Sequence, residues 1–191
     1  MTAWIEFKGV RSDEMGCKIE AMPAEYVPKR RYTRVTVPGR SGALAIDEGA
    51  YEPVTLTASL NLAAKADPRA VNAWLTGSGD LVLSDSPQYR RKAIVIDGIP
   101  YKRRRLCNGE AYDTLAVKFL CDPFLYESEP EILPLESGAV LTNLGTAPAE
   151  PVIEVTGSGQ VALDVGGVGV LLEGLRGTVT LDCEAKAAQV S

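Results

Sequence analysis

The residue types that perform most enzyme chemistry are largely missing from this chain. Its 191 residues include no histidine, which excludes Ser-His and Cys-His nucleophile pairs and removes the commonest general base and metal ligand. Gly157-Ser158-Gly159 lacks the Gly-x-Ser-x-Gly spacing of a nucleophile elbow, and we interpret it as a hairpin turn. No phosphate-binding Gly-x-x-x-x-Gly-Lys-Ser/Thr loop is present. We therefore expect no catalytic residues and no enzyme activity.

Carboxylates and cysteines give no positive sign of a reactive site. The carboxylates are scattered, and nothing in their spacing indicates a catalytic pair. A hydrolase that uses only carboxylates is the weakest of the functions considered for this chain. The four cysteines, Cys17, Cys107, Cys121 and Cys183, are far apart and form no Cys-x-x-Cys pair, which disfavours zinc. We expect reduced, buried thiols in a protein made in a bacterial cytoplasm. No metal and no cofactor is expected.

Three basic clusters are the remaining candidates for a binding surface. They are Lys29-Arg30-Arg31 with Arg34, Arg90-Arg91-Lys92, and Lys102-Arg103-Arg104-Arg105. A surface that binds nucleic acid or phosphate is one interpretation. Because the sequence pI is about 4.9, we favour solvated strand faces or pairing with the acidic surface of a partner. Adjacent arginines on a strand point to opposite faces, so one of Arg103–Arg105 is expected at an interface or in a buried ion pair.

The elements that would position these residues are mostly strands. Alternation and β-branched residues predict a strand over residues 32–37, and further strands over 42–47 and 51–62. Pro38-Gly39 suits the central positions of a type II turn between the first two. Further strands are expected over residues 3–7, 10–20, 81–84, 92–96, 99–106 and 115–121, with a hairpin turn at Asp97-Gly98.

One segment has the pattern of a helix. Asp67 is a candidate N-cap, Pro68 takes the first helical position, and Val71, Trp74 and Leu75 follow at helical spacing. Gly77 is expected to end it. No apolar run approaches the roughly 18 residues of a membrane helix or resembles a secretory signal, so no membrane insertion is expected.

The composition changes near residue 130. Residues 1–129 contain 18 basic and 17 acidic residues, whereas 130–191 contain 2 and 8, and all twelve aromatic residues precede Pro130. We therefore predict a linker within 127–134 between a domain over 1–129 and a second over 130–191. Four short strands with glycine turns, over 151–156, 160–165, 168–173 and 178–183, indicate a β-sandwich or a related sheet in the second. The predicted fold class is mainly β with one short helix.

The order of these motifs resembles the distal tail protein (Dit) family of long-tailed, non-contractile bacteriophages and prophages. The resemblance covers essentially residues 1–129 and rests on Ile5–Val10, Val35–Gly42, Gly49–Glu52, Ser86–Arg90 and Phe119–Phe124. Val-Pro-Gly-Arg-x-Gly and the closing Phe-x-x-x-Pro-type strand are its most specific pieces. Asn143–Pro151 and Gly177–Asp182 resemble parts of the galectin-like β-sandwich of that family.

The resemblance implies a structural protein of the virion tail tip. It implies a homohexameric ring whose first domains continue the tail tube protein and whose second lobes carry a tail-tip fibre or lysin-type hub protein or a receptor-binding protein. The ribbon over Arg30–Leu62 would pack on the adjacent subunit. The candidate intersubunit residues are Arg34, Val37, Pro38, Gly39, Arg40, Gly42 and Tyr51.

A carbohydrate- or surface-binding module is the alternative function. Lectin sites usually stack an aromatic ring on the sugar, and no aromatic residue follows Glu129, so this alternative is disfavoured. Neither interpretation involves sequence-specific recognition of nucleic acid.

Overall fold

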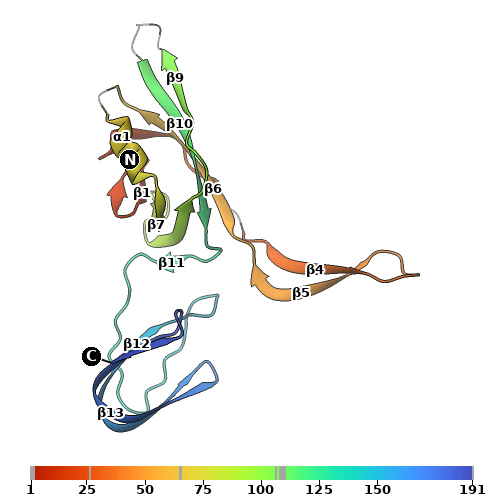
Figure 1. Cartoon of the computed structure of the whole chain (residues 1–191), viewed down its shortest axis with the longest axis vertical. Coiled ribbons are helices and arrows are strands. Elements are labelled where there is room, and N and C mark those ends of the chain that lie inside the picture. The colour runs from red at the N-terminus through yellow and green to blue at the C-terminus, as the bar shows by residue number, and fades with distance from the viewer. Residues whose placement is uncertain (1–2, 26, 65, 106, 108–110, 191) are drawn as a thin grey trace. The chain divides into compact units, whose positions relative to one another are not determined.

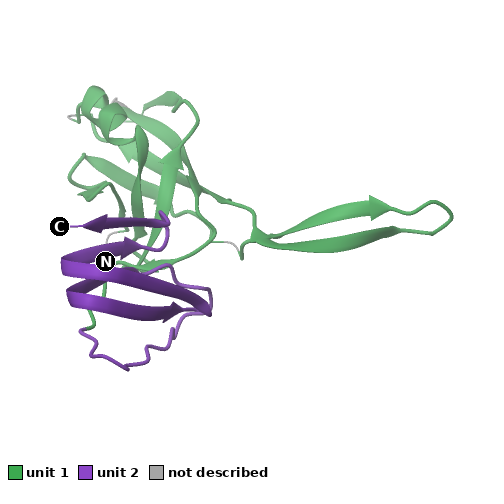
Figure 2. Ribbon diagram, turned by 60° about the horizontal axis from the view of Figure 1, so that its bottom comes forward, with its two compact units in different colours: residues 1–133 green, residues 134–191 purple. Residues whose placement is uncertain are grey.

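The chain folds into two compact units that are mainly β. A computed structural model describes residues 3–25, 27–64, 66–105, 107 and 111–190. The units are residues 1–133 and 134–191, shown in separate colours in Figure 2. Strands make up 55% of the described residues, which confirms the predicted fold class. The units divide between Leu133 and Pro134, within the segment where the composition changes.

One curled sheet organises the first unit (Figure 1). Its main path runs β2-β1-β7-β8-β10-β6-β3, with β11 paired to β8 and β9 paired to β10. The strands are β1 (Ile5–Phe7), β2 (Val10–Arg11), β3 (Cys17–Ala21), β6 (Val54–Leu62), β7 (Gly77–Leu83), β8 (Tyr89–Val95), β9 (Tyr101–Arg105), β10 (Ala111–Cys121) and β11 (Tyr126–Glu127).

The core of the first unit lies on one face of β6 and β10. Nine consecutive residues of these strands pair, from Asp113 opposite Leu62 to Cys121 opposite Val54. Every second residue of β6, from Val54 to Leu62, is buried, which is the alternation expected for a strand with one core face. The rings of Phe7 and Phe119 meet edge to face in this core, with centroids 5.2 Å apart.

The helix forms where the sequence predicts it. Helix α1 spans Pro68–Trp74, and the side chain of Asp67 accepts a hydrogen bond from the backbone N–H of Arg69, as an N-cap should. Trp74 is buried, and its indole Nε1 donates to the carbonyl oxygen of Phe7 at 2.8 Å. This hydrogen bond satisfies the one polar atom of the buried indole and fixes α1 against β1.

The expected hairpin at Asp97-Gly98 does not form. Strand β8 pairs with β10 over residues 93–95, and β9 pairs with β10 over residues 101–105. Both therefore lie along the same edge of β10, and residues 96–100 are an interruption between two collinear strands. An Asp-Gly pair permits a tight turn, but β8 and β9 make more backbone hydrogen bonds by pairing with the long edge of β10 than by pairing with each other. Leu106, the last residue of the predicted strand, lies outside the described residues.

The second unit contains one three-stranded sheet among its described residues. Strands β12 (Val152–Val165), β13 (Val168–Asp182) and β14 (Ala187–Val190) lie in that order. The predicted breaks at Gly157–Gly159 and Gly174–Gly177 are wrong, because both segments continue the long pairing of β12 with β13. A register shift between Gly159 and Val161 marks an irregularity instead. Glycine thus allows the strands to bend without ending them.

The cysteines are free thiols in three different environments. Cys17 and Cys121 are buried, Cys183 is half-buried and Cys107 is exposed, so the expectation of burial is wrong for Cys107. Burial raises the pKa of both the Cys17 and the Cys121 thiols to about 11. Both thiols therefore stay protonated and inert at neutral pH, and they act as small apolar side chains of the core.

A charged side chain also lies on the core side of the sheet. Arg91 of β8 is 5% exposed, and its Nε and Nη1 atoms meet no hydrogen-bond acceptor among the described residues. A guanidinium with two nitrogens buried away from any acceptor opposes folding, because these atoms lose their hydration without an equivalent gain. Arg91 therefore marks a position where the fold tolerates an unfavourable charge.

Replacing Arg91 tests this interpretation. Arg91→Met keeps the length of the side chain and removes the charge, so we expect the free energy of unfolding to rise by about 1–3 kcal/mol. Arg91→Ala leaves a cavity, so we expect its free energy of unfolding to be about 2 kcal/mol lower than that of Arg91→Met. Urea denaturation followed by circular dichroism measures both values. A clear loss of stability in Arg91→Met would show that the guanidinium makes a favourable interaction.

Candidate assembly surface

A two-stranded hairpin projects from the first unit (Figure 1 and Figure 2). Strand β4 (Arg30–Thr36) pairs with β5 (Ala43–Tyr51), and these two strands form a sheet of their own. All seven residues of β4 are exposed, as are the first seven of β5. The hairpin therefore has two solvent-facing sides and no described strand against either edge.

The turn of this hairpin has the predicted geometry. The backbone N–H of Arg40 donates to the carbonyl oxygen of Val37 at 3.2 Å, which places Pro38 and Gly39 at the two central positions. Gly39 has φ of +78°, the conformation that the third residue of a type II turn requires. Gly42, at φ +82°, provides a second left-handed residue before β5 begins.

One side of the hairpin is apolar. Val35 pairs with Leu44, and Thr33 pairs with Ile46, so these side chains share a face. Val37 follows Val35 at the next position of the same alternation. The exposed fractions are 39% for Val35, 39% for Val37, 42% for Leu44 and 48% for Ile46. We call these four side chains the apolar face of the hairpin.

The opposite side of the hairpin is polar or small. Arg34 pairs with Ala45, Thr36 with Ala43, and Tyr32 with Asp47. A ribbon with one apolar and one polar side is amphipathic in the manner of a strand that normally covers a core. Here both sides face solvent in the isolated chain.

Ion pairs gather at the base of the hairpin. The Arg30 guanidinium pairs with Asp47, its Nε donates to the Tyr51 hydroxyl at 3.4 Å, and it lies over the Tyr51 ring at 5.2 Å. Lys29 pairs with Glu52 at 3.0 Å and Arg31 with Glu48 at 3.9 Å. Three residues of the first basic cluster therefore form ion pairs that close the base of the hairpin. These three side chains do not form an open binding patch.

Two rings join this base to the segment after β10. The Tyr51 ring meets the Phe124 ring edge to face, with centroids 5.8 Å apart and an angle of 80°.

The backbone N–H of Gly49, and then the Arg30 guanidinium, hold the pKa of Asp47 below its ordinary value of 3.8. A carboxyl with a lowered pKa contributes stability above its ordinary pKa and loses it as the pH falls further. Acid should therefore loosen the base of the hairpin.

The structure separates the predicted interface residues into two groups. Arg34, Val37, Pro38, Gly39, Arg40 and Gly42 lie in the outer part of the hairpin, whereas Tyr51 lies at its base. Sequence reasoning did not include Val35, Leu44 and Ile46 among the candidates. The alternation of residues 43–47 against 33–37 was the signal that could have identified them.

The residues of the other two basic clusters lie in different environments. Arg90 pairs with Asp80 at 2.9 Å and lies over the Tyr126 ring, while Arg91 is buried and Lys92 lies 5.1 Å from the same ring. This cluster does not form one basic patch. The buried arginine is thus Arg91, whereas Arg103, Arg104 and Arg105, where a buried or interfacial residue was expected, are all exposed.

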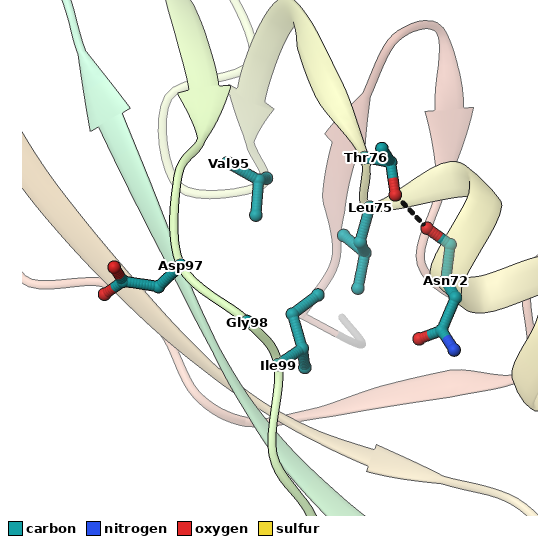
Figure 3. Close-up of a pocket in the computed structure, with 7 residues that line it drawn as sticks. All are labelled: Asn72, Leu75, Thr76, Val95, Asp97, Gly98 and Ile99. Carbon is teal, nitrogen blue, oxygen red and sulfur yellow. Dashed lines mark hydrogen bonds between the residues drawn. The ribbon is translucent and has the colours of Figure 1, made fainter.

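A shallow hollow of about 210 Å³ lies beside the end of α1 (Figure 3). Leu75, Val95 and Ile99 give it an apolar floor, and Asn72, Thr76 and Gly98 complete the rim with Asp97. Asp97 points away from the other lining side chains, and its carboxylate pairs with Lys118 at 3.1 Å. The lining therefore holds no facing pair of carboxylates and no nucleophile beside a base.

Within the described residues, no three His, Cys, Asp or Glu side chains are grouped as metal ligands. No helix in that part of the chain has the length and apolar character needed to cross a membrane. The candidate functional surface is therefore the outer part of the hairpin β4–β5, where large apolar side chains face solvent together.

Removing the guanidinium at the base should loosen the hairpin locally. Arg30→Met keeps the stem of the side chain over Tyr51 but removes the ion pair with Asp47, so we expect amide hydrogen exchange in β4 and β5 to accelerate about three- to tenfold. Exchange in β6 and β10 should not change. Arg34→Met, on the same strand and the same side, is the matched control, and equal acceleration in both variants would contradict a role for the base.

Comparison with known proteins shows a similarity in structure only. No family model and no curated protein sequence matches the chain. The crystal structure of SPP1 Dit (gp 19.1) superposes with a TM-score of 0.70, covering 98% of this chain and 82% of that one at 14% sequence identity. SPP1 Dit is described as a paradigm of the hub adsorption apparatus in phages that infect Gram-positive bacteria. The chain therefore has the fold of the SPP1 Dit protein.

Proposed function

We propose that this chain is a structural protein of a phage tail tip, in which copies join through the hairpin β4–β5. Two independent observations support the proposal. The fold matches that of a phage hub protein over 98% of the chain. The hairpin presents Val35, Val37, Leu44 and Ile46 to solvent on one side, and this apolar face is the single observation that carries the proposal.

The physical argument starts from the weakness of an isolated hairpin. Two strands without a third strand or a packed face are marginally stable in water. Hairpin β4–β5 has ion pairs at its base, but its outer half carries only the turn and the pairing of its own strands. An exposed apolar patch on a projecting element is typical of a surface that is covered by a partner.

A second copy of the chain is the partner that we propose. If the apolar face of one copy packs on a different surface of the next, the contact is heterologous, and its repetition forms a ring when the rotation between copies closes. Burying four half-exposed aliphatic side chains would contribute about 1 kcal/mol each. Six such contacts around a hexamer hold the assembly although each contact alone is weak.

The proposal assigns a place to each unit in the particle. The first units, residues 1–133, would form the ring and continue the tail tube protein at the virion tail tip. The second units, residues 134–191, would form a galectin-like lobe that carries a tail-tip fibre or lysin-type hub protein or a receptor-binding protein. No catalytic step is part of this role.

Polar substitutions on the apolar face test the contact. Val35→Ser with Leu44→Ser removes apolar area at the centre of the face, so we expect self-association to weaken at least about tenfold. Arg40→Glu, just past the turn, should weaken it less. Sedimentation velocity and native mass spectrometry measure the oligomer, and circular dichroism shows whether the monomer stays folded.

The opposite side of the same hairpin supplies the control. Ala43→Ser with Ala45→Ser changes two residues of β5 on the polar side and should leave the oligomer intact. The proposal would be overturned if the wild-type chain stays monomeric at high concentration and with its tail partners. An unchanged oligomer in Val35→Ser/Leu44→Ser would place the contact elsewhere.

A further inference from the structure

A second exposed surface lies at the other end of the large sheet. Strand β9 pairs only with the first part of β10, and the two extend beyond the rest of the sheet (Figure 1). Lys102, Arg103, Arg104 and Arg105 occupy four consecutive positions of β9, and all four are exposed. Four cations in a row repel one another, so the fold tolerates this strand rather than gaining stability from it.

The two sides of β9 differ in their partners. Arg103 lies opposite Asp113, and its Nε approaches the carboxylate at 3.7 Å. On the other side, Lys102 lies opposite Thr114 and Arg104 opposite Tyr112. No ion pair joins Lys102 or Arg104 to any acidic side chain in the described part of the chain.

The unpaired side continues across the sheet. The row of Lys18 on β3, Asn61 on β6, Thr114 on β10 and Lys102 on β9 crosses four paired strands. Alternate residues of β6 and β10 fill the core from the opposite face, so this row lies on the outer side. We call Lys18, Lys102 and Arg104 the basic face of the sheet.

The chemistry of the basic face favours an acidic protein surface over nucleic acid. Binding of a duplex without sequence preference needs several phosphate contacts along a longer track of cations, and binding of single strands also uses exposed aromatic rings on which bases stack. Here the neighbouring aromatic side chain, Tyr112, is half-buried, and the whole chain carries a net charge of −5. A short cationic face on an acidic protein is instead suited to steering one defined contact.

An acidic surface of this kind is present on the same chain. The second unit contains seven acidic residues and two basic residues. Glu154, Asp164 and Glu173 are exposed on strands β12 and β13, and none of them pairs with a basic side chain among the described residues. Their neighbours in sequence, such as Ile153, Val155 and Leu163, take the more buried side of the sheet.

We infer that the basic face of one copy docks on the acidic strands β12 and β13 of another copy. The inference rests on the proposed function in one respect, because it needs copies that associate. It adds a polar contact to the apolar contact of hairpin β4–β5. The two differ in their response to salt, since Coulombic attraction between exposed charges is screened within about 8 Å at physiological ionic strength and apolar burial is not.

Reversal and exchange of charges test the inference on the full chain. Lys102→Glu with Arg104→Glu should weaken self-association about tenfold at low salt, and the difference should shrink in high salt. Glu154→Lys with Glu173→Lys should do the same. A chain that carries all four substitutions should regain wild-type association, because each surface then meets its new complement. Sedimentation velocity at two salt concentrations measures each variant.

A matched control separates this contact from net charge alone. Arg69→Glu places the same charge change on exposed residue 69 of α1 and should leave association unchanged. The inference is overturned if Arg104→Glu behaves like Arg69→Glu, or if the fourfold variant stays weak. It is also overturned if Arg104→Glu abolishes binding of the chain to a DNA duplex in fluorescence anisotropy without affecting self-association.

The result for hairpin β4–β5 keeps the two ideas apart. If Val35→Ser/Leu44→Ser weakens the oligomer and every charge variant matches the wild type, the proposed function stands and the polar contact is excluded. If the wild-type chain does not associate at either salt concentration, both fail together.

Discussion

The pairing of β6 with β10 is the constraint on which the rest of the structure depends. Nine residues pair in unbroken register, and one face of both strands is filled by buried side chains. A shift of one residue would turn this whole apolar set towards solvent, so the register is strongly fixed. Strand β5 ends at Tyr51 and β6 begins at Val54, with only two residues between them. Because β6 is fixed in the core, the short connection from β5 to β6 constrains the direction in which the hairpin projects.

Local sequence chemistry predicted the elements whose form depends on a few adjacent residues. The type II turn at Pro38-Gly39 and the capped start of α1 at Asp67-Pro68 both formed as expected, because φ restrictions and a single side-chain hydrogen bond decide them. The same reasoning failed at Asp97-Gly98 and at Gly157-Ser158-Gly159. These residues permit a turn, yet a longer strand partner was available in each case. Whether a residue pair can form a turn depends on the local sequence. Whether the chain turns or continues as a strand depends on pairing with strands far away in the sequence.

The candidate surface contains apolar side chains that sequence reasoning did not single out. Sequence reasoning selected the arginines and the turn, since charge and glycine are conspicuous in a sequence. The structure shows that Arg30 and Arg31 close the base through Asp47 and Glu48, and that the outer half is distinguished by aliphatic side chains. Which side of a ribbon lacks a cover depends on what packs against it, and no local pattern reports that. The similarity to SPP1 Dit at 14% identity fits this view, because alternation and turns preserve a fold long after individual residues have changed.

The open edges of hairpin β4–β5 have a consequence for the isolated chain. A ribbon with free backbone donors and acceptors on both edges is a template for growth by strand addition, the route to fibrils. Arg34 and Arg40 flank its apolar residues on β4 and at the turn, whereas Arg30 and Arg31 are paired with acidic side chains at the base. Two ribbons approaching edge to edge would bring the cations of Arg34 and Arg40 together, and their repulsion disfavours stacking. Arg34 and Arg40 thus disfavour the growth of fibrils by strand addition to the exposed ribbon.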